Sequence, residues 1–316
     1  MSKFIRQFLP FATLTFLIAA LSALEPDTFL TTENFLNVLS RSSVNGIIAM
    51  GMTAVIISGG IDLSVGSMMA LAGMVGAGVM LKIGGPDAGT AAMLAGTFVG
   101  IGAGLLCGLL NGTLITKLKL PPFIVTLGTM SAFRGTSYIV NNSKMYDVPT
   151  YTFLGQSDLL GVPVSVLILA LVVLIGFFVL RYTRLGRYTY AIGSNRQAAF
   201  HAGVNVDRNL IAIYGLTGLF VGLAAMIQAS RTISAQPTAG ISLELDIIAA
   251  VVIGGASLSG GRGTVIGTIV GTLLISFLRN GCTLLGISTN IQLVVIGAII
   301  IGAVALDQMA RSKAEK

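Results

Sequence analysis

Apolar residues recur in long runs along most of this chain, without the regular return to charged positions that a water-exposed surface requires. Since a membrane-spanning helix needs about 20 mostly apolar residues, the runs predict an all-α, polytopic membrane protein with about ten transmembrane helices. We expect them at residues 8–24, 44–60, 67–83, 90–116, 121–140, 163–181, 209–231, 244–258, 264–280 and 289–306. The segment 33–41 (ENFLNVLSR) is amphipathic, which predicts a helix at a membrane surface.

The first run also has features of a signal peptide, because Lys3 and Arg6 precede it and small residues end it. It is longer than a typical signal core, which favours an uncleaved helix. In both alternatives the second span begins on the outer side of the membrane, so the orientation of the remaining spans is the same.

Composition and charge support a membrane location. Hydrophobic residues make up 54% of the chain and charged residues 10%, against about 25% charged in a soluble domain, which excludes a soluble globule and a disordered chain. With both termini in the cytoplasm, thirteen of the 19 basic residues lie inside and eight of the 12 acidic residues lie outside. This segregation follows the positive-inside rule. Cytoplasmic basic residues therefore explain the net charge of +7, and it does not indicate binding to nucleic acid. We expect residues 1–316 to form a single transmembrane domain.

Glycines at spacing four predict close helix packing. They are Gly96, Gly100, Gly104, Gly108 and Gly112 in the fourth span, Gly263, Gly267 and Gly271 in the ninth, and Gly218 and Gly222 in the seventh. Packing within one bundle is the simpler interpretation, and a homodimer seam is the alternative.

A repeated motif, GGxxLSxG, ends two of the predicted spans that run from outside to inside. The copies are residues 59–66 and 254–261. Paired glycines end a helix, and irregular backbone at membrane depth is tolerated only inside protein or along a watery cavity. The motifs therefore predict the translocation pathway or its gate, at Gly59, Gly60, Asp62, Ser64, Gly254, Gly255, Ser257 and Ser259. Asp62 is either a helix cap or a direct contact to substrate or gate.

The longest inside segment, residues 181–208, carries five arginines and a short predicted helix. Ser194 suits its N-cap and Gly203 its C-terminal end. Small residues, Ala198 and Ala199, lie on a face that could enter a groove. This predicts a docking site for a cytoplasmic partner.

The sequence has no GxxxxGK[ST] phosphate-binding loop, no Ser, His and Asp in the order of a catalytic triad, and no cluster of metal-ligand residues. We therefore expect no enzyme activity, cofactor or metal, and any ATP hydrolysis must come from another chain. The two cysteines, Cys107 and Cys282, are expected to be buried thiols.

Five segments together resemble the permease subunits of bacterial ribose-type sugar ABC importers: residues 51–67, 122–135, 183–206, 234–264 and 290–303. The resemblance runs from about residue 28 to 308. It implies an ATPase-coupling segment at Thr183–Val206, with Arg184, Gly186, Arg187, Gly193, Asn195, Ala198 and Gly203 as coupling residues.

The resemblance also implies partners: a second permease copy, an ABC ATPase that usually carries two fused cassettes, and a periplasmic sugar-binding protein. The location it implies is the bacterial inner membrane. An ion-coupled secondary transporter is the alternative, but such transporters place acids or histidines inside their spans, and Asp62 is nearly the only candidate here. A membrane enzyme would need a catalytic constellation that the sequence lacks.

Overall fold

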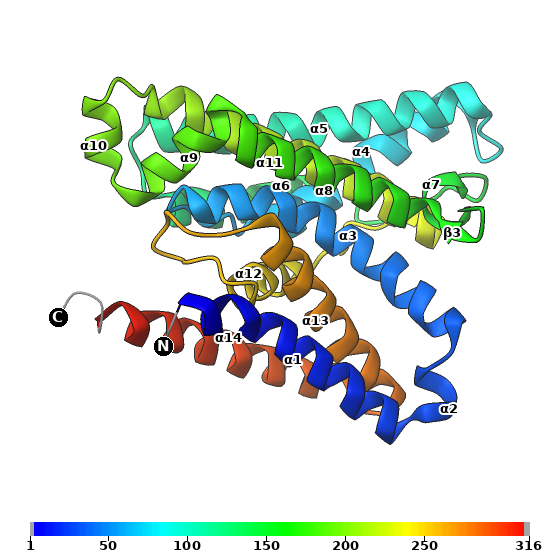
Figure 1. Cartoon of the computed structure of the whole chain (residues 1–316). Coiled ribbons are helices and arrows are strands. Elements are labelled where there is room, and N and C mark those ends of the chain that lie inside the picture. The colour runs from blue at the N-terminus through cyan, green and yellow to red at the C-terminus, as the bar shows by residue number, and fades with distance from the viewer. Residues whose placement is uncertain (1–2, 313–316) are drawn as a thin grey trace.

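The structure, a computed structural model that describes residues 3–312, is an all-α bundle (Figure 1). Its main helices are α1 (Lys3–Leu24), α3 (Thr32–Ile57), α4 (Val65–Gly84), α5 (Thr90–Lys117), α6 (Pro122–Ile139), α8 (Val164–Tyr182), α11 (Val206–Thr232), α12 (Leu243–Ile253), α13 (Val265–Leu284) and α14 (Thr289–Ser312). Each of the ten predicted spans coincides with one of these helices. Six of them, α3, α4, α5, α8, α11 and α13, are long and apolar enough to cross a membrane.

Short elements cluster at the two ends of the bundle (Figure 1). At one end lie α2 (Pro26–Phe29), α7 (Phe153–Gln156) and two small hairpins, β1 (Tyr146–Asp147) with β4 (Ser234–Ala235) and β2 (Asp158–Leu159) with β3 (Val162–Pro163). At the other end lie α9 (Arg184–Ser194) and α10 (Arg196–His201), and the start of α1 and the end of α14 are on the same side of the molecule. This arrangement agrees with the two-sided distribution of charge along the sequence.

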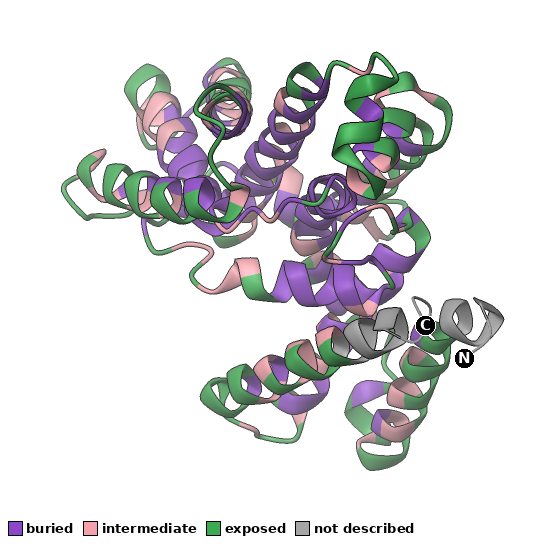
Figure 2. Ribbon diagram, turned by 90° about the vertical axis from the view of Figure 1, so that its left-hand side faces the viewer, coloured by how far each residue is buried: buried purple, intermediate pink, exposed green. Residues whose placement is uncertain are grey.

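Helix α3 lies at the centre of the bundle. Its apolar stretch is 83% buried, whereas that of the peripheral α8 is only 22% buried, and Figure 2 shows the same gradient from buried centre to exposed edge. The predicted helix at 33–41 is present but is not a separate element, because these residues form the first turns of α3. Thr31 starts the helix by accepting a hydrogen bond from the Asn34 amide, and the buried Val38 turns inward.

The glycines of α5 pack against helices of the same chain. Gly104 and Gly108 approach the backbone of α11 at Gly218, and Gly96 and Gly100 face α4. On α13, Gly267 and Gly271 approach α12 in the same way. These contacts support packing within one bundle. The α5 glycine face is buried and leaves no room there for a seam with a second copy.

Helix α12 is shorter than the span predicted at 244–258. With 11 residues at 1.5 Å per residue it is about 16 Å long, roughly half of a ~30 Å hydrocarbon core. An irregular segment, residues 236–242, precedes α12 and connects it to β4.

Candidate functional site

The predicted docking segment forms two helices rather than one. Thr183 starts α9 by accepting a hydrogen bond from the Gly186 amide, and Asn195 starts α10 by accepting one from the Ala198 amide at 2.9 Å. Ser194 is therefore not the cap; it is the last residue of α9, and Asn195 has the extended backbone that an N-cap requires. Gly203 follows α10 with a φ of +82° and confirms the predicted helix end.

The two alanines of α10 have different environments. Ala199 is buried with Ile192, Val206 and Leu210, which holds α10 against α9 and α11. Ala198 is exposed. Phe200, on a different side of α10 from Ala198, is 66% exposed, a large apolar side chain that sequence analysis missed. An aromatic residue in an otherwise polar segment was the signal that could have found it.

Arg184 and Arg187 are exposed on α9, whereas Gly186 is buried where α9 leaves α8. A side chain at Gly186 would collide with the Val179 and Leu180 carbonyls. Gly186 therefore permits the sharp turn between the two helices, and the arginines are free to contact a partner or anionic lipid.

Helices α3 and α12, which lead into the two motifs, end with the same backbone geometry at a glycine of the GG pair. The left-handed residue is the first glycine in one copy, Gly59 with a φ of +83°, and the second glycine in the other, Gly255 with a φ of +94°, so the two helix endings correspond with a shift of one residue from the motif alignment. In the first copy the Gly60 amide donates to the Val55 carbonyl at 3.0 Å, and in the second the Ala256 amide donates to the Val251 carbonyl at 3.1 Å. This is the Schellman helix ending, in which the left-handed position favours glycine.

The two motifs meet each other and α9 at one point. The Gly261 amide donates a hydrogen bond to the carbonyl of Ile57, the last residue of α3, at 2.8 Å, so the loop after α12 is joined directly to the end of α3. Gly193 lies against both, and a Cβ atom there would collide with the Ile57 carbonyl and the Gly261 amide. Gly260 also contacts Gly193 and Gly59. We call this contact of α9 with the two motif loops the glycine junction. Sequence analysis treated the coupling segment and the motifs as separate sites.

Asp62 holds the first motif loop in place. Its carboxylate accepts hydrogen bonds from the Ser64 amide at 2.9 Å, the Ser64 hydroxyl at 2.6 Å and the Asn111 side chain of α5 at 3.4 Å. Asp62, Ser64 and Asn111 are fully buried. Asn111 was missed because nothing local in the sequence relates it to a residue 49 positions earlier. In the second motif Ser257 is buried and Ser259 is exposed, and no acid occupies the position of Asp62.

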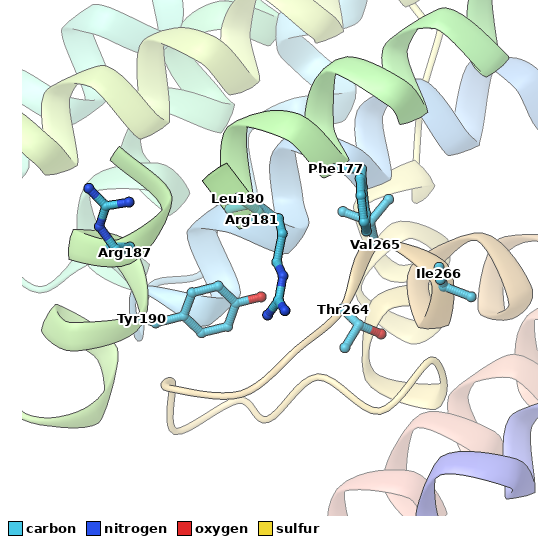
Figure 3. Close-up of a pocket in the computed structure, with 8 residues that line it drawn as sticks. All are labelled: Phe177, Leu180, Arg181, Arg187, Tyr190, Thr264, Val265 and Ile266. Carbon is cyan, nitrogen blue, oxygen red and sulfur yellow. The ribbon is translucent and has the colours of Figure 1, made fainter. Parts of the chain in front are cut away.

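An open cleft of about 600 Å³ lies beside the glycine junction (Figure 3). Its lining includes Arg181, Arg187 and Tyr190 on one side and Thr264 and Ile266 on the other. Figure 3 shows Arg181 beside the Tyr190 ring. The Tyr190 hydroxyl donates to the Gly263 carbonyl at 2.8 Å, a second link between α9 and the loop after α12. Burial raises the pKa of Tyr190, with a smaller lowering by Arg181, so the hydroxyl keeps the proton it donates.

Among the described residues no group of three His, Cys, Asp or Glu side chains could hold a metal ion. Cys107 and Cys282 are both unpaired and buried within that same part of the chain. What the structure does contain is a multi-helix apolar bundle with a polar two-helix docking element joined to the ends of two inner helices. That combination fits the class of multi-pass membrane permeases.

Comparison with known proteins agrees with this class. Residues 34–304 match the family of permease components of branched-chain amino acid transport systems, and the chain belongs to this family. No solved structure matches the chain.

Several of the curated relatives are named as sugar import permeases. The ribose import permease of Bacillus subtilis is 46% identical over 95% of this chain and 92% of its own length. The ribose import permease of Escherichia coli is 41% identical over 92% of this chain and 90% of its own length. The D-allose transport permease of E. coli is 38% identical over 95% of this chain and 90% of its own length.

Proposed function

We propose that this chain is the transmembrane permease subunit of an ABC importer that translocates a monosaccharide, ribose or a related sugar. The observation that carries the proposal is the 46% identity to a ribose import permease over nearly the full length of both chains. A fructose import permease of Rhizobium meliloti, 38% identical over 88% of this chain, supports the class of substrate. A partner chain hydrolyses the ATP.

The glycine junction supports a route from ATP use to the gate. We assign ATPase coupling to Arg184, Gly186, Arg187, Gly193, Asn195, Ala198, Ala199 and Gly203 on α9 and α10. When the ATPase moves α10, Gly193 displaces the loops after α3 and α12 together, because it lies against both. The motif residues Gly59, Gly60, Asp62, Ser64, Gly254, Gly255, Ser257 and Ser259 then act as the inner gate rather than as a fixed sugar site.

The assembly contains a second copy of the permease, an ABC ATPase with two fused cassettes and a periplasmic sugar-binding protein. It lies in the bacterial inner membrane, with both termini and α9–α10 in the cytoplasm. The concentration of basic residues at the end that carries α9 and α10 supports this orientation.

Reconstitution tests the function directly. Proteoliposomes with this chain, its ATPase and its binding protein should accumulate ribose only with ATP, and the permease alone should bind no nucleotide. A matched preparation with a Walker-lysine variant of the ATPase is the control. Uptake driven by an ion gradient without ATP would instead make the chain a secondary transporter.

Impermeant thiol labelling tests the orientation. Ser194→Cys, at the end of α9, should react only from the cytoplasmic side, and Ser143→Cys, in the loop after α6, only from the periplasmic side. Both serines are exposed. Reaction of Ser194→Cys in intact cells would mean that the sides are reversed.

A further inference from the structure

Two contacts of different kinds join α9 to the loop between α12 and α13. At Gly193 the contact is steric, because an added Cβ atom would collide with the Ile57 carbonyl and the Gly261 amide. At Tyr190 the contact is a hydrogen bond, which the hydroxyl donates to the Gly263 carbonyl at 2.8 Å. Tyr190 precedes Gly193 by nearly one helical turn, so both contacts lie on the same side of α9.

The two contacts transmit different forces. Packed atoms resist being pushed together, but each pair attracts only weakly. A hydrogen bond holds donor and acceptor near one distance and therefore also resists their separation. Among the described residues no hydrogen bond joins Gly193 to the loop. Gly193 can therefore push the loop, whereas Tyr190 can also pull it.

The loop is built to pass on a pull at Gly263. The Ser257 amide donates to the Arg262 carbonyl at 3.0 Å, so the loop is bonded across itself. The Gly261 amide in turn donates to the Ile57 carbonyl. A displacement of Gly263 therefore reaches the end of α3 through a short stretch of backbone and one hydrogen bond.

Gly263 also adjoins the start of α13. The next residue, Thr264, is the N-cap of that helix, and its hydroxyl accepts a hydrogen bond from the Gly267 amide at 3.0 Å. An added Cβ atom on Gly263 would collide with the Ile57 side chain. The carbonyl that Tyr190 binds is thus connected both to the end of α3 and to the beginning of α13.

The position of Tyr190 favours a lasting bond. The ring is half-buried and lines the cleft beside the glycine junction, with Arg181 next to it (Figure 3). Partial burial strengthens a hydrogen bond, because the local dielectric constant is lower than in water. The ring makes the packing contacts and the hydroxyl makes the bond, so the two can be separated by substitution.

We propose that Tyr190 is a positioning residue for coupling, whose hydroxyl pulls the loop between α12 and α13 when α9 moves away from it. Gly193 pushes the same loop when α9 moves inward. A transporter returns to its starting state after each turnover, so both directions are required. The proposal rests on the importer function proposed above and adds the residue that drives the return movement. Tyr190 needs no contact with sugar or ATPase for this role.

Tyr190→Phe tests the pull in the assembled transporter, with this chain, its ATPase and its binding protein in proteoliposomes. The substitution removes the hydroxyl and keeps the ring. We expect the ATPase to copurify and to hydrolyse ATP, while the number of sugars imported per ATP falls about fivefold, within the range for one hydrogen bond. A purely structural defect would lower the amount of assembled transporter and leave this ratio unchanged.

Tyr188→Phe is the matched control. Tyr188 lies on the same helix two residues earlier and is exposed, so loss of its hydroxyl should leave the number of sugars imported per ATP unchanged. An unchanged ratio in Tyr190→Phe as well would overturn the proposal and leave the importer function intact. Failure of the unmodified transporter to import sugar with ATP would instead contradict the function itself.

Movement of the loop has a separate readout. Arg262→Cys, on an exposed loop position, is labelled with an impermeant thiol reagent from the cytoplasmic side, with and without ATP. The unmodified chain, whose two cysteines are buried, is the blank. We expect ATP to change the labelling rate several-fold, and much less when Tyr190→Phe is added. An equal change in both proteins, or no change in either, would mean that Tyr190 does not move the loop.

Discussion

Gly193→Val is expected to abolish coupled sugar uptake while the permease still inserts and still binds its ATPase. A side chain at Gly193 would meet the Ile57 carbonyl and the Gly261 amide at the glycine junction. Overpacking of this kind costs about 1–3 kcal/mol, and here the strain falls on the hydrogen bond that joins the loop after α12 to the end of α3. Uptake should fall more than about tenfold, which corresponds to about 1.4 kcal/mol, and ATP hydrolysis should no longer respond to sugar.

Ala191→Val is the matched control for Gly193→Val. Ala191 lies two residues earlier in α9 and is exposed, so the same side chain there should leave uptake near normal. Gly193→Ala provides an intermediate step and should show a partial defect. Normal, sugar-stimulated ATP hydrolysis and uptake in Gly193→Val would mean that movement reaches the gate without passing through the junction.

Ala198→Arg is expected to abolish uptake by a different route, through loss of the ATPase. Ala198 is exposed on the second helix of the docking element, and the exposed Phe200 flanks the buried Ala199 on the other side of that helix. A small residue on an exposed helix face suits a helix that enters a groove, and loss of a central interface contact typically costs 2 kcal/mol or more of binding, about thirtyfold. Copurification of the ATPase should drop accordingly, and docking of the binding protein on the opposite face should not change.

Two neighbouring substitutions make the Ala198 result specific. Gln197→Arg adds the same side chain one position away, about 100° around the helix, and should have the smaller effect. Phe200→Ala should weaken ATPase binding without adding charge. If Ala198→Arg retains uptake, the contact with the ATPase lies elsewhere. Loss of receptor docking with ATPase binding intact would instead place α10 outside the cytoplasm.

Features that depend on neighbouring residues were predictable from the sequence. The apolar runs identified every one of the ten main helices because burial in lipid acts on each run by itself. The GG pairs ended α3 and α12 because a left-handed residue is favoured by glycine whatever surrounds it. Charge placed α9 and α10 at the same end as the start of α1 and the end of α14. The predicted N-cap of α10 was wrong by one residue. Ser194 and Asn195 both suit an N-cap, but α9 extends through Ser194, so Asn195 is the residue that caps α10.

Features that depend on contacts between distant residues were decided only by the tertiary structure. Sequence analysis listed Gly193 and both GG motifs, yet nothing local shows that Gly193 lies against Ile57 and Gly261 at once. In the same way, sequence analysis did not single out Arg134, and the structure makes it the partner of the Pro237 and Ala239 carbonyls, more than 100 positions away. The physical reason is that periodicity and backbone preference are properties of short segments. A junction between distant residues, by contrast, exists only where packing brings unrelated segments together and each must satisfy the polar groups of the other.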